Sequence, residues 1–163
     1  MEARNSMWPP GDPAIRPVRP GEAAALTELV MRSKAHWGYG PDFMARARAE
    51  LTVTPDMIEA DRVAVVEDGG EPAGLYALAF GDDGTAELDL FFVDPDGLGS
   101  GHGRRLFVHA CAAARDAGSR RLVVEADPNA AGFYARMGMT RTGERASPVE
   151  AGRMLPVLEM ALA

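Results

Sequence analysis

Four glycines occupy alternate positions in one short loop of the chain, at Gly97, Gly99, Gly101 and Gly103. The residues before this loop alternate as in a strand, and the residues after it have helical spacing. Because glycine has no Cβ, the backbone amides of such a loop can approach an anion closely. The N-terminus of the following helix adds a partial positive charge. The segment therefore predicts a cradle for phosphate groups.

Two well-known nucleotide motifs fit this loop poorly. The pattern G-x-x-x-x-G-K-[ST] is absent, because no lysine follows the glycines. The dinucleotide fingerprint G-x-G-x-x-G is not matched either, since His102 and Arg104 stand at positions that it requires. Glu125, about twenty residues further on at the end of the next strand, keeps a dinucleotide alternative open. The hairpins expected before the loop count against it, because that fold is built from βαβ units.

The strand end Val93-Asp94-Pro95 and the loop from Leu98 to Gly103 resemble the acyl-CoA motif of the GNAT superfamily of N-acetyltransferases, [Gln/Arg]-x-x-Gly-x-[Gly/Ala]. Asn129, Phe133-Tyr134 and Gly138-Met139 resemble its second motif, N-x-x-A-x-x-F-Y-x-x-x-G-[FM]. The resemblance covers the chain from Ala14 onward. Leu98 departs from the preferred Gln or Arg. Because backbone amides make most of such a site, we expect weaker side-chain support there without loss of binding.

The resemblance implies direct transfer of an acetyl group from acetyl-CoA to a primary amine, which needs a proton for the departing thiolate. Tyr134 occupies the general-acid position of the family; the alternative is an aromatic residue of the core. Asn129 would bond the pantetheine arm, and it is equally natural as a helix N-cap. Both roles of Asn129 are compatible.

Glu87 is the candidate general base. It lies eleven residues before Leu98, the offset of the catalytic glutamate in histone-type members of the superfamily. Strand alternation predicts Glu87, Asp89, Phe91 and Val93 on one face, with Leu88, Leu90 and Phe92 on the other. Two carboxylates this close would raise one pKa. The alternatives are a solvent-exposed carboxylate, or deprotonation of the amine through a water chain.

The resemblance also implies the other cofactor contacts. The backbone at Phe92 and Val93 would face the pantetheine, because the family's strand splays here from its parallel neighbour, residues 120–125. The phosphate contacts would come from Leu98, Gly99, Ser100, Gly101, His102, Gly103 and Arg104. We expect His102 to be solvated or near phosphate, and Arg105 and His109 to lie at the surface.

The acceptor side is expected in the first two helices and their connection. His36, Trp37 and Tyr39 gather aromatic area on a glycine-rich joint, as in a binding loop for a small molecule. Asp89 is the fourth candidate substrate contact. The alternative for the three aromatic residues is packing that closes one end of the core.

The elements that position these residues follow from periodicity and turn residues. We expect a mixed α/β (α+β layered) fold, GNAT-like, with a mostly antiparallel central sheet of six to seven strands flanked by about four helices. Predicted strands are 14–19, 62–68, 72–80, 85–93, 120–126, 139–147 and 154–160. Predicted helices are 22–33, 42–50, an N-capped turn at 54–58, 102–117 with Gly118 as its stop, and 130–137.

Composition limits the remaining choices. The chain has 163 residues and a formal charge of -7, which disfavours nucleic acid and anionic membrane surfaces as partners. The single Cys111 excludes an intramolecular disulfide, and residues 1–20 hold no signal-peptide core, so a cytoplasmic location is expected. We expect a flexible arm at 1–13, one acetyltransferase domain at 14–163, a small-molecule or peptide amine as acceptor, and a possible homodimer. A catalytically inactive acyl-CoA-binding sensor or interaction module is the alternative function.

Overall fold

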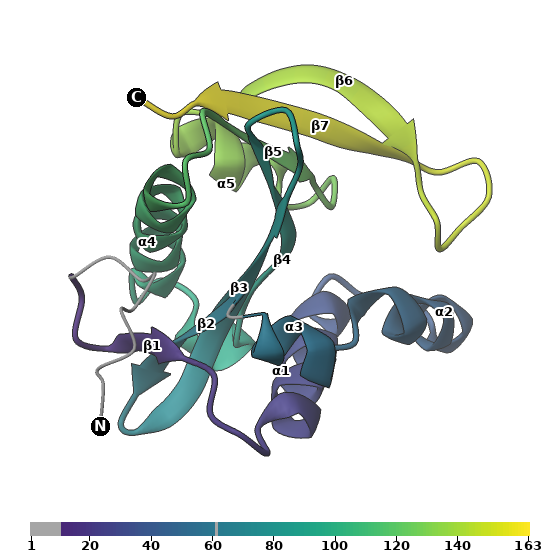
Figure 1. Ribbon diagram of the computed structural model, residues 1–163. Helices are drawn as coiled ribbons and strands as arrows, with labels where there is room; N and C mark the ends of the chain where they lie inside the picture. The colour runs from purple at the N-terminus through teal and green to yellow at the C-terminus, as the bar shows by residue number, and fades with distance from the viewer. Residues whose placement is uncertain (1–10, 61) are drawn as a thin grey trace.

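The computed structural model describes residues 11–60 and 62–163 and contains a seven-stranded sheet (Figure 1). The strand order is β1-β2-β3-β4-β5-β7-β6, and every neighbouring pair is antiparallel except β4 and β5. This confirms the mixed, mostly antiparallel fold. The strands are β1 (Ile15–Pro17), β2 (Val63–Asp68), β3 (Glu71–Phe80), β4 (Thr85–Val93), β5 (Arg121–Glu125), β6 (Thr140–Ala146) and β7 (Met154–Ala161).

Helices cover the two faces of the sheet unequally. Helices α4 and α5 lie on one face, whereas α1, α2 and α3 lie on the other, beside the β1–β4 half (Figure 1). Thr54 caps α3 by accepting a hydrogen bond from the Met57 N–H at 3.3 Å, as predicted. The helices are α1 (Ala23–Ala35), α2 (Pro41–Leu51), α3 (Pro55–Glu59), α4 (His102–Asp116) and α5 (Ala131–Arg136), and a 3₁₀ turn, η1, spans Pro95–Gly97.

A β-bulge in β4 overturns the predicted alternation of this strand. Leu90 pairs with Ala77 and Leu88 with Leu78, so Asp89 is an extra residue without a partner in β3. Leu88 packs in the core under α4, whereas Leu90 packs under α1. The assignment of Glu87 and Phe91 to one face is therefore wrong, because the bulge reverses the alternation between them.

The two parallel strands β4 and β5 separate partway along their length. Their pairing extends from Thr85 opposite Arg121 to Glu87 opposite Val123 and goes no further. Beyond Glu87 the backbone of β4 up to Val93 is released from this neighbour. The splay expected from the family resemblance is present, and it opens a cleft at the carboxyl ends of both strands.

The buried side of α4 differs from the prediction at Ala117 and His109. Its buried stripe contains Leu106, Ala110, Ala113 and Ala114 as predicted, but Ala117 is exposed. His109 is buried rather than at the surface, and its Nδ1 lies 2.7 Å from the Tyr76 hydroxyl. A polar partner on β3 makes this burial tolerable.

The start of the described chain is tied to α4. Asp12, which belongs to the predicted arm, accepts hydrogen bonds from the Arg105 guanidinium and from the Ala14 N–H. Arg105 is therefore directed at Asp12 rather than free in solvent. Residues 1–10 of the predicted arm lie outside the described residues. Within the described ranges, no helix has the length and apolar character needed to cross a membrane.

Candidate active site

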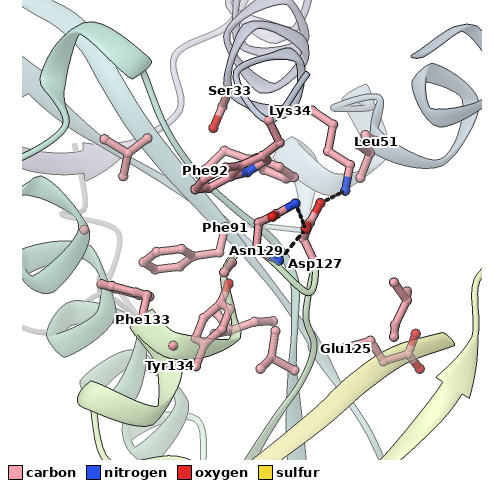
Figure 2. A pocket seen from close by; sticks show the side chains of 18 of the residues that line it. Ser33, Lys34, Leu51, Phe91, Phe92, Glu125, Asp127, Asn129, Phe133 and Tyr134 are labelled. Atoms are coloured by element: carbon pink, nitrogen blue, oxygen red, sulfur yellow. Dashed lines mark hydrogen bonds and ion pairs between the residues drawn. The ribbon is translucent and has the colours of Figure 1, made fainter. Parts of the chain in front are cut away.

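A cavity of about 700 Å³ opens where β4 and β5 separate. One end is formed by the glycine-rich loop and the start of α4, and the other by α1, α2 and the connection between β6 and β7. Figure 2 shows Phe133 and Tyr134 on one side of it and Asp127 between Lys34 and Asn129. Most of the predicted site residues line this cavity: Trp37, Glu87, Asp89, Phe92, Val93, Leu98, Gly99, Gly101, His102, Gly103, Arg104, Asn129 and Tyr134.

The start of α4 presents unpaired backbone donors to the cavity. The first helical bond runs from the Arg105 N–H to the Gly101 carbonyl at 3.1 Å. The amides of Gly101 to Arg104 therefore have no acceptor inside the helix. Gly101 adopts φ +87°, a left-handed conformation that favours glycine. These donors and the helix dipole fit a pyrophosphate group.

Glycine at position 103 also has a packing reason. A Cβ there would lie 3.2 Å from the Phe133 ring, closer than an ordinary contact. A side chain at this position would therefore crowd the Phe133 ring and push the start of α4 away from α5. The close approach places the anion cradle beside the segment that carries Tyr134.

The side chains of the glycine-rich loop offer an anion fewer contacts than the backbone amides do. Leu98 is 53% exposed. Arg104 is exposed and lines the cavity, where its charge can reach an anion. His102 is buried rather than solvated, with Nε2 3.2 Å from Asp68, because the imidazole packs beneath Gly97. Ser100 donates its hydroxyl proton to the Gly97 carbonyl, which stabilises the turn.

Tyr134 lies in an aromatic wall of the cavity. Its ring centroid is 5.3 Å from that of Phe133 and 5.8 Å from that of Phe91, with Phe107 behind them. The tyrosine is 4% exposed. Burial, with a smaller contribution from the Asp127 charge, raises its pKa well above 10. The phenol is therefore protonated at neutral pH, and it is a core aromatic residue as well.

Glu87 differs from two neighbouring carboxylates of the cleft, Asp89 and Glu125. Asp89 is paired with Arg62 at 3.0 Å, and Glu125 with Arg145 at 2.8 Å. Among the described residues, Glu87 has no hydrogen-bond or ion-pair partner. Burial, then the charges of Glu125 and Asp89, raise its pKa, and Arg145 partly opposes them. A carboxylate with a raised pKa is a stronger base than an exposed glutamate.

Asp127 is a site residue that the sequence analysis missed. Its carboxylate accepts hydrogen bonds from Lys34 at 2.6 Å and Tyr39 at 2.7 Å, and from the Asn129 backbone at 2.8 Å. Burial raises its pKa, but the bonds from Lys34, Asn129 and Tyr39 outweigh this, so the pKa lies below its ordinary value. The bond from the Asn129 N–H also makes Asp127 the first residue of an Asx turn at Asp-Pro-Asn.

The spacing of the second motif points to Asp127 as a site residue. The second motif requires asparagine seven positions before the tyrosine, which is position 127 and not 129. Asn129 is also not the N-cap, because α5 begins after Ala130. The side chain of Asn129 instead donates to Asp127 at 3.0 Å and to the Tyr39 hydroxyl at 3.1 Å. Its contact with pantetheine stays a prediction.

The three aromatic residues of the glycine-rich joint have different surroundings. Trp37 lines the cavity and is 45% exposed, whereas His36 is exposed and packs edge-on against it at 5.4 Å. Tyr39 stacks on Phe43 at 4.2 Å and bonds to Asp127. The joint therefore supplies one residue, Trp37, to the cavity surface, whereas Tyr39 packs against α2 and Asp127.

The chain matches the model of the acetyltransferase (GNAT) family over residues 25–139 and belongs to that family. The match includes the glycine-rich loop, Glu87 and Tyr134. The dinucleotide alternative is thereby excluded. The chain is an N-acetyltransferase, and acetyl-CoA is its acyl donor.

The chain is 37% identical to the peptidyl-lysine N-acetyltransferase YjaB of Salmonella typhimurium over 123 residues, which is 73% of this chain and 79% of that protein. The fold is similar to the GCN5-related N-acetyltransferase of Rhodopseudomonas palustris, with a TM-score of 0.74 and 22% identity over 93% of this chain and 97% of that one. It is also similar to the PaiA N-acetyltransferase of Thermoplasma acidophilum in complex with coenzyme A, with a TM-score of 0.73 and 13% identity over 90% and 97%.

Proposed function

We propose that this protein transfers the acetyl group of acetyl-CoA directly to a primary amine, the ε-amine of a peptidyl lysine. The observation that carries the proposal is the cavity, which has unpaired backbone donors at one end and the unpaired Glu87 carboxylate toward the other. A cationic amine is complementary to that carboxylate. Two proteins similar to this chain are peptidyl-lysine N-acetyltransferases, which supports lysine over a small-molecule amine as the acceptor.

The amides of Gly101 to Arg104 would hold the pyrophosphate, and the β4 backbone after Glu87 would align the pantetheine in the splayed cleft. Acetyl-CoA supplies a thioester whose carbonyl carbon is open to a neutral amine. Glu87, directly or through water, accepts the proton of the ammonium so that the nitrogen lone pair can form the new C–N bond. Tyr134 donates its hydroxyl proton to the sulfur as the C–S bond breaks. The nitrogen loses a second proton as the amide forms, and this proton, transferred through water, restores the phenol.

The raised pKa values of both residues support these roles. Tyr134 must be protonated before transfer, and burial keeps it so at neutral pH. Glu87 must be ionised to accept a proton, and its raised pKa makes it a stronger base than an exposed glutamate. The cytoplasmic location and the homodimer stay predictions.

The experiment is a thiol-release assay with purified protein, acetyl-CoA and a peptide that contains one lysine. The same peptide with norleucine at that position is the matched control. We expect free thiol and acetylated peptide in equal amounts with lysine, and background thiol with norleucine. Acetyl-CoA binding without turnover on lysine peptides, N-terminal amines and polyamines would instead favour the inactive binding module.

A further inference from the structure

Asp127 connects segments that are far apart in the sequence. It lies between β5 and α5, and its carboxylate contacts Lys34 at the end of α1 and Tyr39 in the α1–α2 joint. Arg153, just before β7, approaches the same carboxylate at 3.6 Å. The Asp127 side chain thus joins the turn that leads into α5 to three other segments of the chain. We call the part of the site formed by Lys34, Tyr39 and Arg153 on these segments the acceptor wall.

The two oxygens of Asp127 have separate partners. Oδ2 receives Lys34 Nζ at 2.6 Å, Tyr39 Oη at 2.7 Å and Arg153 at 3.6 Å. Oδ1 receives the backbone N–H and the side-chain amide of Asn129, at 2.8 and 3.0 Å. One oxygen therefore faces the acceptor wall, and the other faces the turn on the cofactor side. Figure 2 shows both sets of contacts meeting at this residue.

The wall that Oδ2 supports is a stack of planar groups. The Tyr39 ring lies 4.2 Å from the Phe43 ring, and the Arg153 guanidinium lies 4.7 Å from the centroid of the Tyr39 ring. The Tyr39 hydroxyl also accepts a hydrogen bond from Arg153. Trp37, two residues away along the joint, forms part of the cavity surface. Displacement of Tyr39 would therefore move the aromatic surface that an acceptor meets.

The burial of these charges makes their pairing necessary. The side chains of Asp127, Lys34 and Arg153 are 10%, 12% and 15% exposed. A partly buried cation that loses its anion is strongly unfavourable, so removal of the carboxylate charge would force Lys34 and Arg153 to rearrange. The same charge also offsets one of the two positive charges that a cationic acceptor would otherwise meet.

We infer that Asp127 is a positioning residue for the acceptor. Its Oδ2 holds the wall formed by Lys34, Tyr39 and Arg153 at a fixed position relative to the acetyl donor, and its Oδ1 fixes the turn on the donor side. The inference rests on the proposed function. This chain differs here from the family motif, which has an asparagine at the position of Asp127 and no negative charge to hold two cations.

The test is Asp127→Asn, because asparagine keeps one acceptor oxygen for Asn129 and presents a donor to Lys34 and Tyr39. We expect the KM for the lysine peptide to rise about tenfold, since charge-assisted hydrogen bonds are lost. The Kd for acetyl-CoA should stay within about twofold. Tyr39→Phe, which removes a single Oδ2 contact, should raise the amine KM about threefold. Asp116→Asn, an equal charge change at the exposed end of α4, is the matched control and should change neither constant.

A second readout separates this inference from the proposed function. In a Trp8→Phe background Trp37 is the single tryptophan, and acrylamide quenching of its fluorescence reports how firmly the wall is held. Quenching should increase with Asp127→Asn and Tyr39→Phe but not with Asp116→Asn. A wild-type protein that acetylates no amine would defeat the proposed function and leave this readout intact. An amine KM and quenching equal to those of the control, or an acetyl-CoA Kd weakened as much as the amine KM, would overturn the inference.

Discussion

Replacement of Tyr134 with phenylalanine tests the general-acid role most directly. The Tyr134 ring packs in a cluster with Phe91, Phe107 and Phe133, at centroid distances of 5.3 to 6.5 Å. Phenylalanine keeps this packing and removes only the hydroxyl. Among the described residues the hydroxyl has no hydrogen-bond partner to lose, so the free energy of unfolding should change by less than about 1.5 kcal/mol, the net value of one hydrogen bond.

The expected kinetic effect is much larger than the effect on stability. Proton transfer by a positioned group contributes roughly 10²- to 10⁴-fold to a rate. We therefore expect kcat to fall at least about 100-fold, which corresponds to about 2.7 kcal/mol in the activation free energy. The Kd for acetyl-CoA should change less than about twofold, because the phenol's proton is needed during transfer rather than for binding.

The assay measures thiol release at saturating acetyl-CoA with varied lysine peptide, and calorimetry measures acetyl-CoA binding. Tyr76→Phe is the matched control, because it removes a buried tyrosine hydroxyl on β3 that faces His109 and does not line the cavity. The control should lose stability and keep kcat. A kcat for Tyr134→Phe within a factor of about three of wild type would refute the acid role, and parallel losses in kcat and acetyl-CoA affinity would assign the hydroxyl to binding.

Three further predictions follow from the cleft and the core. Glu87→Gln should lower kcat/KM and remove the acid limb of the kcat/KM–pH profile. Because the raised pKa means that the folded protein holds the Glu87 proton more tightly than the unfolded chain does, the stability of the wild type falls as pH rises through that pKa. The variant should therefore have the higher Tm at neutral pH. An unchanged acid limb would favour a water chain. Gly103→Ala should weaken acetyl-CoA binding in calorimetry, because its Cβ would crowd the α5 aromatic ring at 3.2 Å, whereas Gly143→Ala meets nothing within 4 Å and should bind normally. Leu106→Ala should lower the free energy of unfolding in urea by about 2–5 kcal/mol, since the leucine is fully buried, whereas Val108→Ala, 59% exposed, should change it by about 0.5 kcal/mol or less; equal losses would contradict the assignment of the α4 core face.

The elements of this fold could be predicted from the sequence because each is a local pattern. The seven strands and the helices fall within a few residues of the predicted positions, and turn residues such as Gly118, at φ +89°, end them as expected. The amides that we propose as the anion cradle could be located for the same reason, since the loop, its glycines and the helix start are contiguous in the chain. A prediction from local periodicity also assumes that each strand pairs with its neighbour without a bulge. The bulge at Asp89 breaks that assumption, and it changed the face assigned to Phe91.

The parts of the site that the sequence analysis missed depend on distant partners. Asp127 meets Lys34 from 93 residues away and Tyr39 from 88. His109 is buried because Tyr76, 33 residues earlier, supplies its partner. An apolar stripe cannot reveal such pairs, because each polar residue alone resembles a surface residue. The spacing of the second motif was the one local sign of Asp127.

The bulge and the splay of β4 together give an acidic protein one cavity that offers free amides to an anionic donor and, in the proposed function, a carboxylate to a cationic acceptor. The bulge at Asp89 reverses the alternation, so Glu87 lies on the α1 face of the sheet and Phe91 on the α4 face with the aromatic wall. The splay starts after Glu87, so the released backbone leads from that carboxylate toward the amides at the start of α4. Positive potential at the donor end comes from backbone dipoles, which the formal charge of -7 does not count. The carboxylates can therefore gather at the acceptor end without opposing phosphate binding.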